Sequence, residues 1–141
     1  MKRTIFAVGL FCAAAAGSAT AHEGAMGVVR ERMVAMSDMS ESVKAIQRAL
    51  ETGGDSAVVV QNAERIRSHA GASMIELFSP ETDRTKSRAK QELWERMDEF
   101  KELANRLEAS AATLAAEPTS DNMRGMLRNC GSCHQRFREK R

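Results

Sequence analysis

The residues best suited to chemistry lie near the carboxyl end of the chain. Cys130, Cys133 and His134 stand in the order Cys-Gly-Ser-Cys-His. This C-x-x-C-H pattern is typical of the covalent attachment of a c-type haem. Two thiols three residues apart can form thioethers with the vinyl groups on one porphyrin edge, and the next residue places an imidazole beneath the iron. The motif therefore predicts one haem c, attached through Cys130 and Cys133, with His134 as the proximal iron ligand.

Three other kinds of site share part of this pattern. A thioredoxin-like redox pair needs a βαβ context, and the sequence shows no strand-like alternation. A structural zinc site needs a second pair of ligands, whereas His22 and His69 are single and far apart. A plain disulfide forms in an oxidising compartment but needs no adjacent histidine. The haem interpretation is the one that uses all three residues.

The amino-terminal segment is typical of a secretory signal. Lys2 and Arg3 precede an apolar run over residues 5–16, which is too short to span a bilayer. Small residues at 19–21 suit cleavage after Ala21. We expect residues 1–21 to be removed, leaving residues 22–141 as one soluble domain in the periplasm. A membrane anchor is the alternative, and export supports the haem interpretation because bacteria attach c-type haem outside the cytoplasmic membrane.

Charge and composition exclude several classes of protein. Removal of Lys2 and Arg3 cancels the formal net charge of +2, so a nucleic-acid binder is not expected. The chain has no Tyr and one Trp, which argues against a β-sandwich or barrel. The few aromatic residues and the many Ala and Met residues also leave a core without its usual bulk. A haem inside the fold would supply a large, flat apolar group.

Apolar residues recur at helical spacing in the first half of the domain. The first stretch covers residues 29–50 and stops at the glycine pair 53–54, which is a helix-end signal. A capping residue at 55 or 56 can begin the second helix, which we expect to include residues 59–77 and to end before Pro80.

The second half of the domain also contains two predicted helices. After a polar loop over residues 79–87, a long amphipathic stripe covers residues 93–114 and is followed by Pro118. A cap at 119 or 120 begins the last helix, whose apolar face covers residues 123–137 and includes the haem motif. Helices joined by short loops favour antiparallel neighbours. We therefore predict an all-α, up-down-up-down four-helix bundle with the haem bound inside.

The motifs occur in an order that resembles one family. They are Arg32-x-x-x-Met36 with Met39 and Val43-Lys44-Ala45-Ile46, then Leu77-Phe78, Leu93-Trp94, and Cys130 to His134 with Phe137-Arg138. With the haem motif on the last helix of an exported bundle, this set resembles the class II cytochromes c. That family comprises the cytochrome c′ group and its low-spin relatives. We expect the low-spin, cytochrome c-556-like branch.

The resemblance implies that Met36 determines the coordination of the iron. Low-spin members place a methionine at this position, and its thioether completes a His/Met iron. High-spin cytochromes c′ place another apolar residue there and leave the iron five-coordinate. We expect Met36 to be the sixth ligand. Met33, one turn away, can compete with Met36, and an open site is the third possibility.

Other residues take their expected roles from the same resemblance. The arginine that matches Arg32 pairs with a haem propionate, for which its planar head is well suited. Trp94 and Phe78 match positions that pack near the haem or close the end of the bundle. His69 lies beside the apolar stripe of the second helix, so we expect it to be partly exposed rather than an iron ligand.

These expectations give two candidate functions. A six-coordinate His/Met haem would make the chain an electron-transfer protein that serves periplasmic redox proteins. The alternative is a five-coordinate cytochrome c′ that binds nitric oxide or carbon monoxide at an open distal site. The sequence contains no catalytic triad or carboxylate pair, so we do not expect an enzyme. The resemblance implies a possible homodimer through the first two helices, because homodimers are common in the family. The sequence alone demonstrates no exposed apolar patch on the first helix, so monomer and dimer both stay open.

Overall fold

The computed structural model describes residues 27–82, 84 and 87–140. The predicted signal peptide, residues 1–21, lies outside them. The described chain is almost wholly helical, and its one β-type pairing is an isolated antiparallel bridge between Ala89 and Arg138. The prediction of an all-α protein is confirmed. Within the described ranges, no helix combines the length and the apolarity that a membrane crossing requires.

Helix α1, Val28–Thr52, follows the first predicted stretch and ends at the predicted glycine pair. Gly53 adopts the left-handed conformation, with φ of 63°, and its N–H donates to the carbonyl of Ala49. A glycine takes this conformation without the steric cost of a Cβ atom. The helix therefore ends where the backbone can turn toward α2.

The second predicted helix is divided in two. Helix α2 covers Ser56–His69 and helix α3 covers Gly71–Leu77, so the single helix expected over residues 59–77 is wrong. Ala70 has an extended conformation with ψ of −172°, and Gly71 has φ of 54°. Neither residue continues a right-handed helix, so the backbone bends sharply between the two segments.

The third predicted helix is also interrupted. Helix α4 covers Glu92–Glu95 and helix α5 covers Met97–Ala116, with a break at Arg96, whose φ of −120° and ψ of 45° are not helical. The stripe expected over residues 93–114 is therefore shared between a short turn and a long helix. Leu93 remains buried, so the break redirects the chain without removing this apolar residue from the core.

Side chains cap the starts of α2 and α6, as the sequence predicts. The carboxylate of Asp55 accepts a hydrogen bond of 2.8 Å from the N–H of Ala57. Helix α6, Ser120–Phe137, begins after Thr119, whose hydroxyl accepts from the N–H of Asn122 at 3.2 Å. Each bond satisfies a backbone donor that the first turn leaves without a partner.

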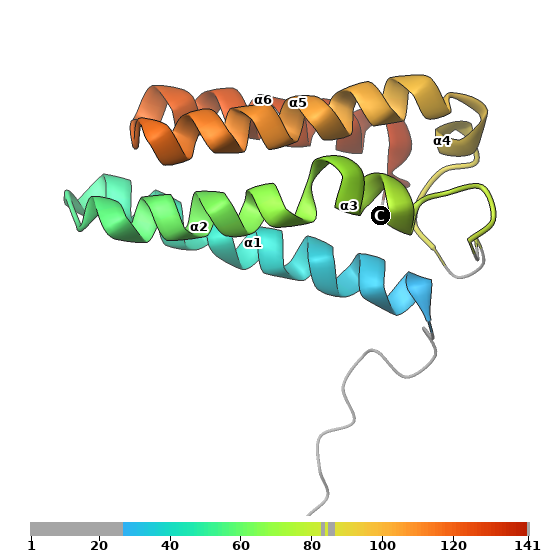
Figure 1. The fold of residues 1–141 in the computed structure, drawn as a ribbon, viewed down its shortest axis with the longest axis horizontal. Helices are drawn as coiled ribbons and strands as arrows, with labels where there is room; N and C mark the ends of the chain where they lie inside the picture. Colours follow the sequence, from blue (N-terminus) through green and yellow to red (C-terminus); the bar gives the residue numbers. More distant parts are fainter. Residues whose placement is uncertain (1–26, 83, 85–86, 141) are drawn as a thin grey trace, which may run out of the picture.

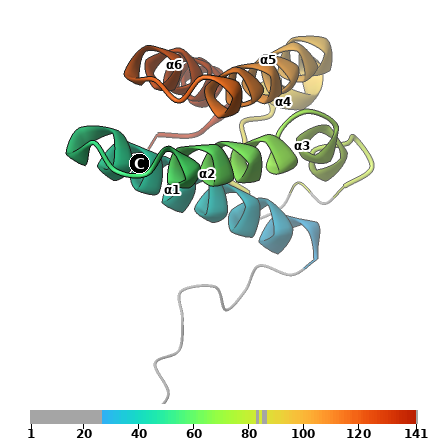
Figure 2. The same cartoon turned by 60° about the vertical axis from the view of Figure 1, so that its left-hand side comes forward.

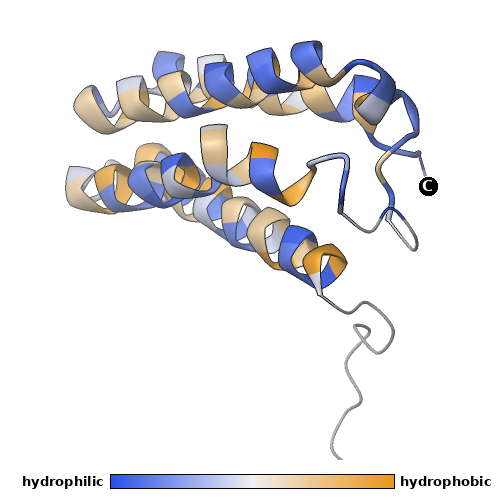
Figure 3. Cartoon of the chain, turned by 45° about the vertical axis from the view of Figure 1, so that its right-hand side comes forward, coloured by the Kyte–Doolittle hydropathy of each residue, from blue (hydrophilic) through white to orange (hydrophobic). Residues whose placement is uncertain are grey.

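The four long helices form two layers (Figures 1 and 2). Helices α1 and α2 make one layer and α5 and α6 the other, and the chain direction alternates from each long helix to the next. The pairs α1–α2, α2–α5 and α5–α6 pack extensively, whereas α1 and α6 touch at few points. Apolar and polar residues alternate along the helices (Figure 3), as amphipathic packing requires. The predicted four-helix bundle is confirmed.

The core lies between the two layers and is richest in aromatic residues at one end. The ring of Phe100 lies 5.2 Å from that of Phe78 and 6.0 Å from that of Phe137, centroid to centroid. The rest of the core is aliphatic, alanine and methionine; among its most deeply buried members are Ile46, Val59, Ala63, Ala111, Leu114 and Met126. The aromatic end is the end at which α6 finishes and α3 leads into the loop (Figure 1).

Candidate haem site

Helix α6 brings the three motif residues together within little more than one turn. Cys130 and Cys133 are three residues apart, so both lie on the face that packs toward the core, and both are partly buried. Neither thiol is in a disulfide. His134 follows directly and is exposed to solvent. The helix therefore presents two free thiols and an accessible imidazole along one side.

The surroundings of these groups set their protonation states. Burial raises the pKa of the Cys130 thiol above its usual range. Burial, with the neighbouring Cys130, raises the pKa of Cys133 to about 11. Although His134 as a whole residue is exposed, partial desolvation of its imidazole against the helix surface, followed by the nearby guanidinium of Arg138, lowers the pKa of His134. Near neutral pH the site thus holds protonated thiols and a neutral imidazole, which is the form of histidine that binds a metal.

His134 lies on the edge of α6 away from α5. The amide nitrogen of Asn129 donates to the hydroxyl of Ser110 at 3.0 Å, so Asn129 marks the edge of α6 that faces α5. His134 lies five residues later, which is about 140° further around a helix that turns 100° per residue. It therefore stands near the opposite edge of α6, on the side that α1 approaches without close packing.

Met36 occupies the corresponding edge of α1. Asp38 lies 3.3 Å from Arg65 and 3.4 Å from His69, both on α2, so Asp38 marks the edge of α1 that faces α2. Met36 lies two residues earlier, about 160° around the helix, and faces away from α2. It is partly buried against the core. Helices α1 and α6 run antiparallel (Figure 1). Met36 is in the amino-terminal half of α1 and His134 in the carboxyl-terminal half of α6, so both belong to the same end of the bundle.

Helices α1 and α6 meet at a sparsely packed junction. Apolar side chains continue along it on both helices. Val43 follows Met36 at an interval of seven residues on α1, and Leu127 precedes His134 by seven on α6; both are only partly buried. Met33 is 38% exposed and Met39 is buried, so neither matches the intermediate burial of Met36. An apolar group placed between α1 and α6 would complete the burial of these side chains.

Arg32 is not an ordinary surface arginine. Its side chain is buried, with only 4% of the residue exposed. Its Nε donates to the carbonyl of Leu77 at 2.7 Å, and its Nη2 donates to the hydroxyl of Thr82 at 2.5 Å. The guanidinium carbon lies 4.6 Å from the ring centroid of Phe78 and 5.8 Å from that of Trp94. These contacts fix a cation one turn before Met36.

The residues present fit a c-type haem. Two free thiols at the required spacing precede an imidazole, an incompletely buried apolar junction lies beside them, and a buried guanidinium can meet a carboxylate. The alternatives fit less well. Among the described residues, no group of three His, Cys, Asp or Glu side chains could hold a metal ion. His69 is partly exposed, as expected, and lies on α2, which does not touch α6.

Sequence reasoning missed the residues that hold Arg32 in place. Thr82 lies in the loop after α3, where no periodicity indicates which side chains turn inward. The Leu77 acceptor is a backbone carbonyl, which exists at every position of every sequence. Only the fold shows that this helix end and loop meet α1.

Comparison with known proteins agrees with this geometry. A family model described as Cytochrome C′ matches residues 27–138. The chain belongs to the cytochrome c′ family. This family binds haem c with its iron, which agrees with the predicted cofactor.

Solved cytochromes c′ share the fold. The chain is similar to cytochrome c′ from Thermochromatium tepidum, with a TM-score of 0.73 and 25% identity over 80% of this chain and 95% of that one. It is similar to cytochrome c′ from Rhodopseudomonas palustris, with a TM-score of 0.70 and 27% identity over 83% and 99%. It also resembles the nitric oxide complex of a variant from Alcaligenes xylosoxidans, with a TM-score of 0.70 and 19% identity over 81% and 94%. No curated protein matches the chain.

These comparisons bear on the choice between the two branches of the family. The expectation of a class II cytochrome c is confirmed. The narrower expectation of the low-spin branch, with Met36 on the iron, is not supported, because the matched structures are described as cytochromes c′. They favour the alternative, a cytochrome c′, over a His/Met-ligated relative.

Proposed function

We propose that this chain is a periplasmic cytochrome c′ that binds a small diatomic gas, nitric oxide or carbon monoxide. Cys130 and Cys133 would attach haem c through two thioethers, and His134 would be its proximal iron ligand. When bound, the haem supplies an iron with one open coordination position and one-electron chemistry. The observation that carries the proposal is the placement of this motif opposite the apolar edge of α1 in a member of the cytochrome c′ family.

The residues of α1 would form the distal wall of the gas site. Met36 is packed against the core, and the neighbouring Met39 is buried. Apolar side chains exclude water from the distal position but make no hydrogen bond to a ligand. They would therefore favour a small, weakly polar gas over a charged or strongly hydrated ligand. The nitric oxide complex known for the Alcaligenes xylosoxidans variant gives this ligand class a precedent in the same fold.

The second candidate function is electron transfer with Met36 as sixth ligand. It is favoured by one observation, which is that Met36 occupies the edge of α1 opposite the edge of α6 that carries His134. A thioether at that position could complete a six-coordinate iron, which would leave no site for a gas. Redox proteins of the periplasm would then be its partners.

An absorption spectrum combined with one substitution separates the two functions. We expect the purified protein to show high-spin haem bands and its ferrous form to bind carbon monoxide rapidly. Met36→Leu should leave the spin state unchanged, because the residue only lines the distal site. Met33→Leu, at an exposed neighbour, is the matched control. A low-spin spectrum that becomes high-spin in Met36→Leu alone would contradict the gas-binding function and establish electron transfer.

We also propose that the protein forms a homodimer through α1 and α2. Among the described residues, the large apolar side chains that remain exposed are Met33, Val34 and Val58, and all lie on these two helices. Burial of such side chains between two copies would favour association. Val34 is 50% exposed, so Val34→Glu should shift the protein toward monomers in sedimentation equilibrium. A wild-type protein that is monomeric at all concentrations tested would contradict this assignment.

A further inference from the structure

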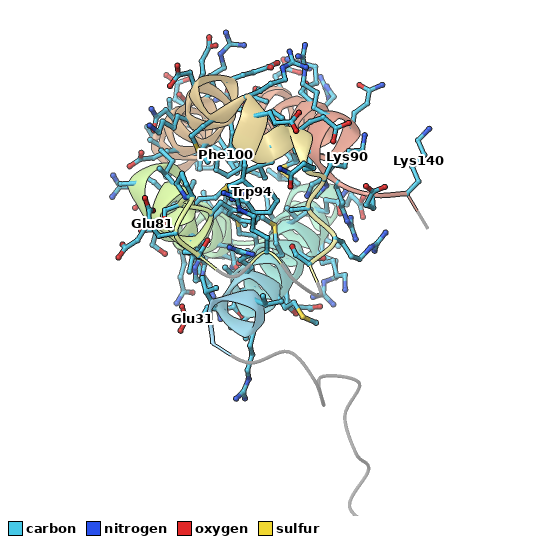
Figure 4. The ribbon with its side chains drawn as sticks, turned by 90° about the vertical axis from the view of Figure 1, so that its right-hand side faces the viewer. Glu31, Glu81, Lys90, Trp94, Phe100 and Lys140 are labelled. Atoms are coloured by element: carbon cyan, nitrogen blue, oxygen red, sulfur yellow. The ribbon has the colours of Figure 1, made fainter. Side chains whose placement is uncertain are left out.

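One buried polar atom at the aromatic end of the bundle has no hydrogen-bond partner. The indole Nε1 of Trp94 is fully shielded from solvent and donates to nothing in the described structure. Trp94 belongs to α4 and lies at the middle of the bundle end, between Phe100 and the layer that contains α1 (Figure 4). An indole N–H that is removed from water without an acceptor destabilises the fold, and buried tryptophans usually have one.

The surroundings of Trp94 favour an anionic acceptor. The guanidinium carbon of Arg32 lies 5.8 Å from the centroid of the Trp94 ring, and that of Arg84 lies 5.0 Å from it. Arg32 is buried and its direction is fixed by Leu77 and Thr82. Two guanidinium groups therefore lie within 6 Å of the ring that carries this shielded N–H donor. Cations and an N–H donor gathered at one place suit a carboxylate. The ring therefore marks a place where a negative charge would be stabilised.

A carboxylate of this kind belongs to the proposed cofactor. The propionates lie on the part of the porphyrin rim away from the vinyl groups, so they need donors that do not come from the Cys-x-x-Cys-His turn. Helix α4 contacts α6, and the N–H of Lys90, just before α4, donates to the carbonyl of Phe137 at 2.8 Å. Trp94 is thus held beside the end of the helix that carries the haem motif.

We propose that Nε1–H of Trp94 donates a hydrogen bond to a haem propionate and acts as a second carboxylate donor beside Arg32. This inference rests on the proposed haem attachment, but not on whether the iron is five- or six-coordinate. It assigns Trp94 a binding role, whereas the sequence indicated only packing. It also gives an acceptor to an indole N–H for which the described part of the chain supplies none.

The experiment uses the haem-loaded protein and exploits the fact that Trp94 is the only tryptophan of the chain. Its indole N–H gives one assignable signal in ¹⁵N–¹H spectra of the diamagnetic ferrous protein, with carbon monoxide added where the iron is five-coordinate. We expect this signal to exchange with solvent deuterium at least tenfold more slowly than a free indole. It should also move in a single step as the propionate titrates.

A matched pair of variants tests the same bond through the haem. Trp94→Phe keeps an aromatic ring but removes the donor, so the charged propionate loses a stabilising contact and its pKa rises. The pH at which the reduction potential changes should move up by about one unit, as expected for one hydrogen bond to a charged group. Arg84→Gln, which leaves Nε1 in place, should preserve the pH-dependent step of the indole signal.

The outcomes are separable from those of the proposed function. An indole signal that exchanges freely or does not move with pH, in a protein that retains covalent haem, would overturn the inference and leave the proposed function intact. A signal that is protected from exchange but does not move with pH would also overturn the inference, because the acceptor of the indole N–H would then be a neutral group. A chain that carries no haem in a haem-stained gel would overturn both.

Discussion

At the scale of single residues, the ease of prediction depends on how far apart in sequence a group's partners lie. Cys130, Cys133 and His134 are neighbours in the chain, so their spacing alone predicts the site. Arg32 takes its acceptors from Leu77 and Thr82, which lie 45 and 50 residues away. No periodicity in the sequence predicts such a contact. Only the resemblance to a family indicated that Arg32 has a binding role.

Arg32 provides the first prediction at this scale. Arg32→Met should destabilise the haem-free chain by about 2–4 kcal/mol, because two acceptors lose a buried charged donor. The measurement is the midpoint of urea unfolding at a fixed slope. Arg30→Met, at an exposed position of the same helix, should change stability by less than about 0.5 kcal/mol. Equal effects of the two substitutions would show that the burial of Arg32 contributes nothing to stability.

At the scale of helices, the ends were predictable and the breaks were not. The end of α1 at Gly53 and the caps at Asp55 and Thr119 follow from local chemistry, which the sequence contains. At Gly71, where φ is 54°, the backbone lies so close to α5 that a Cβ atom would be 1.9 Å from Oε2 of Glu108, a contact that the sequence does not reveal. The break at Arg96 has no local signal at all, and the apolar stripe continues through it.

Gly71 yields the second prediction. Gly71→Ala should destabilise the chain by about 1–3 kcal/mol, since the new methyl group meets Glu108 and the positive φ is strained for alanine. Gly125→Ala, inside α6 with its nearest atom at 3.6 Å, should instead stabilise it by about 0.5–1 kcal/mol. Chemical unfolding of both variants gives the comparison. Adding Glu108→Ala to Gly71→Ala should recover part of the loss, and full recovery would exclude backbone strain as a cause.

The carboxyl end gives the third prediction, again for an element. Beyond α6, the N–H of Glu139 donates to the carbonyl of Arg88 at 2.8 Å, and Nη2 of Arg88 donates to the carbonyl of Glu139 at 2.7 Å. Removal of residues 138–141 should cost about 1–2 kcal/mol and increase amide exchange at the end of α6. A chain that lacks only residues 140–141 keeps both bonds and should match the wild type. If the two truncations behave alike, the pairing does not stabilise the helix end.

At the scale of the whole molecule, the sparse aromatic content is explained by where the aromatic residues gather. Phe78, Phe100 and Phe137 form one cluster, and Trp94 shares Arg32 with it. The middle and the far end of the core depend on aliphatic, alanine and methionine side chains. Three of the four junctions between long helices are closely packed, and the fourth, between α1 and α6, is not. The haem motif lies at that fourth junction.

The last prediction follows from this uneven packing. The double variant Cys130→Ala/Cys133→Ala cannot hold haem covalently, so apolar side chains such as Met36 and Leu127 would stay partly exposed at the α1–α6 junction. We expect its melting temperature to fall by about 10 °C or more, which corresponds to about 3 kcal/mol for a domain of this size. Circular dichroism at 222 nm provides the measurement. Leu127→Ala should destabilise the haem-loaded protein more than the haem-free variant, because only a bound haem completes the burial of that side chain. Equal melting of the loaded and haem-free proteins would mean that the α1–α6 junction is already closed without a cofactor.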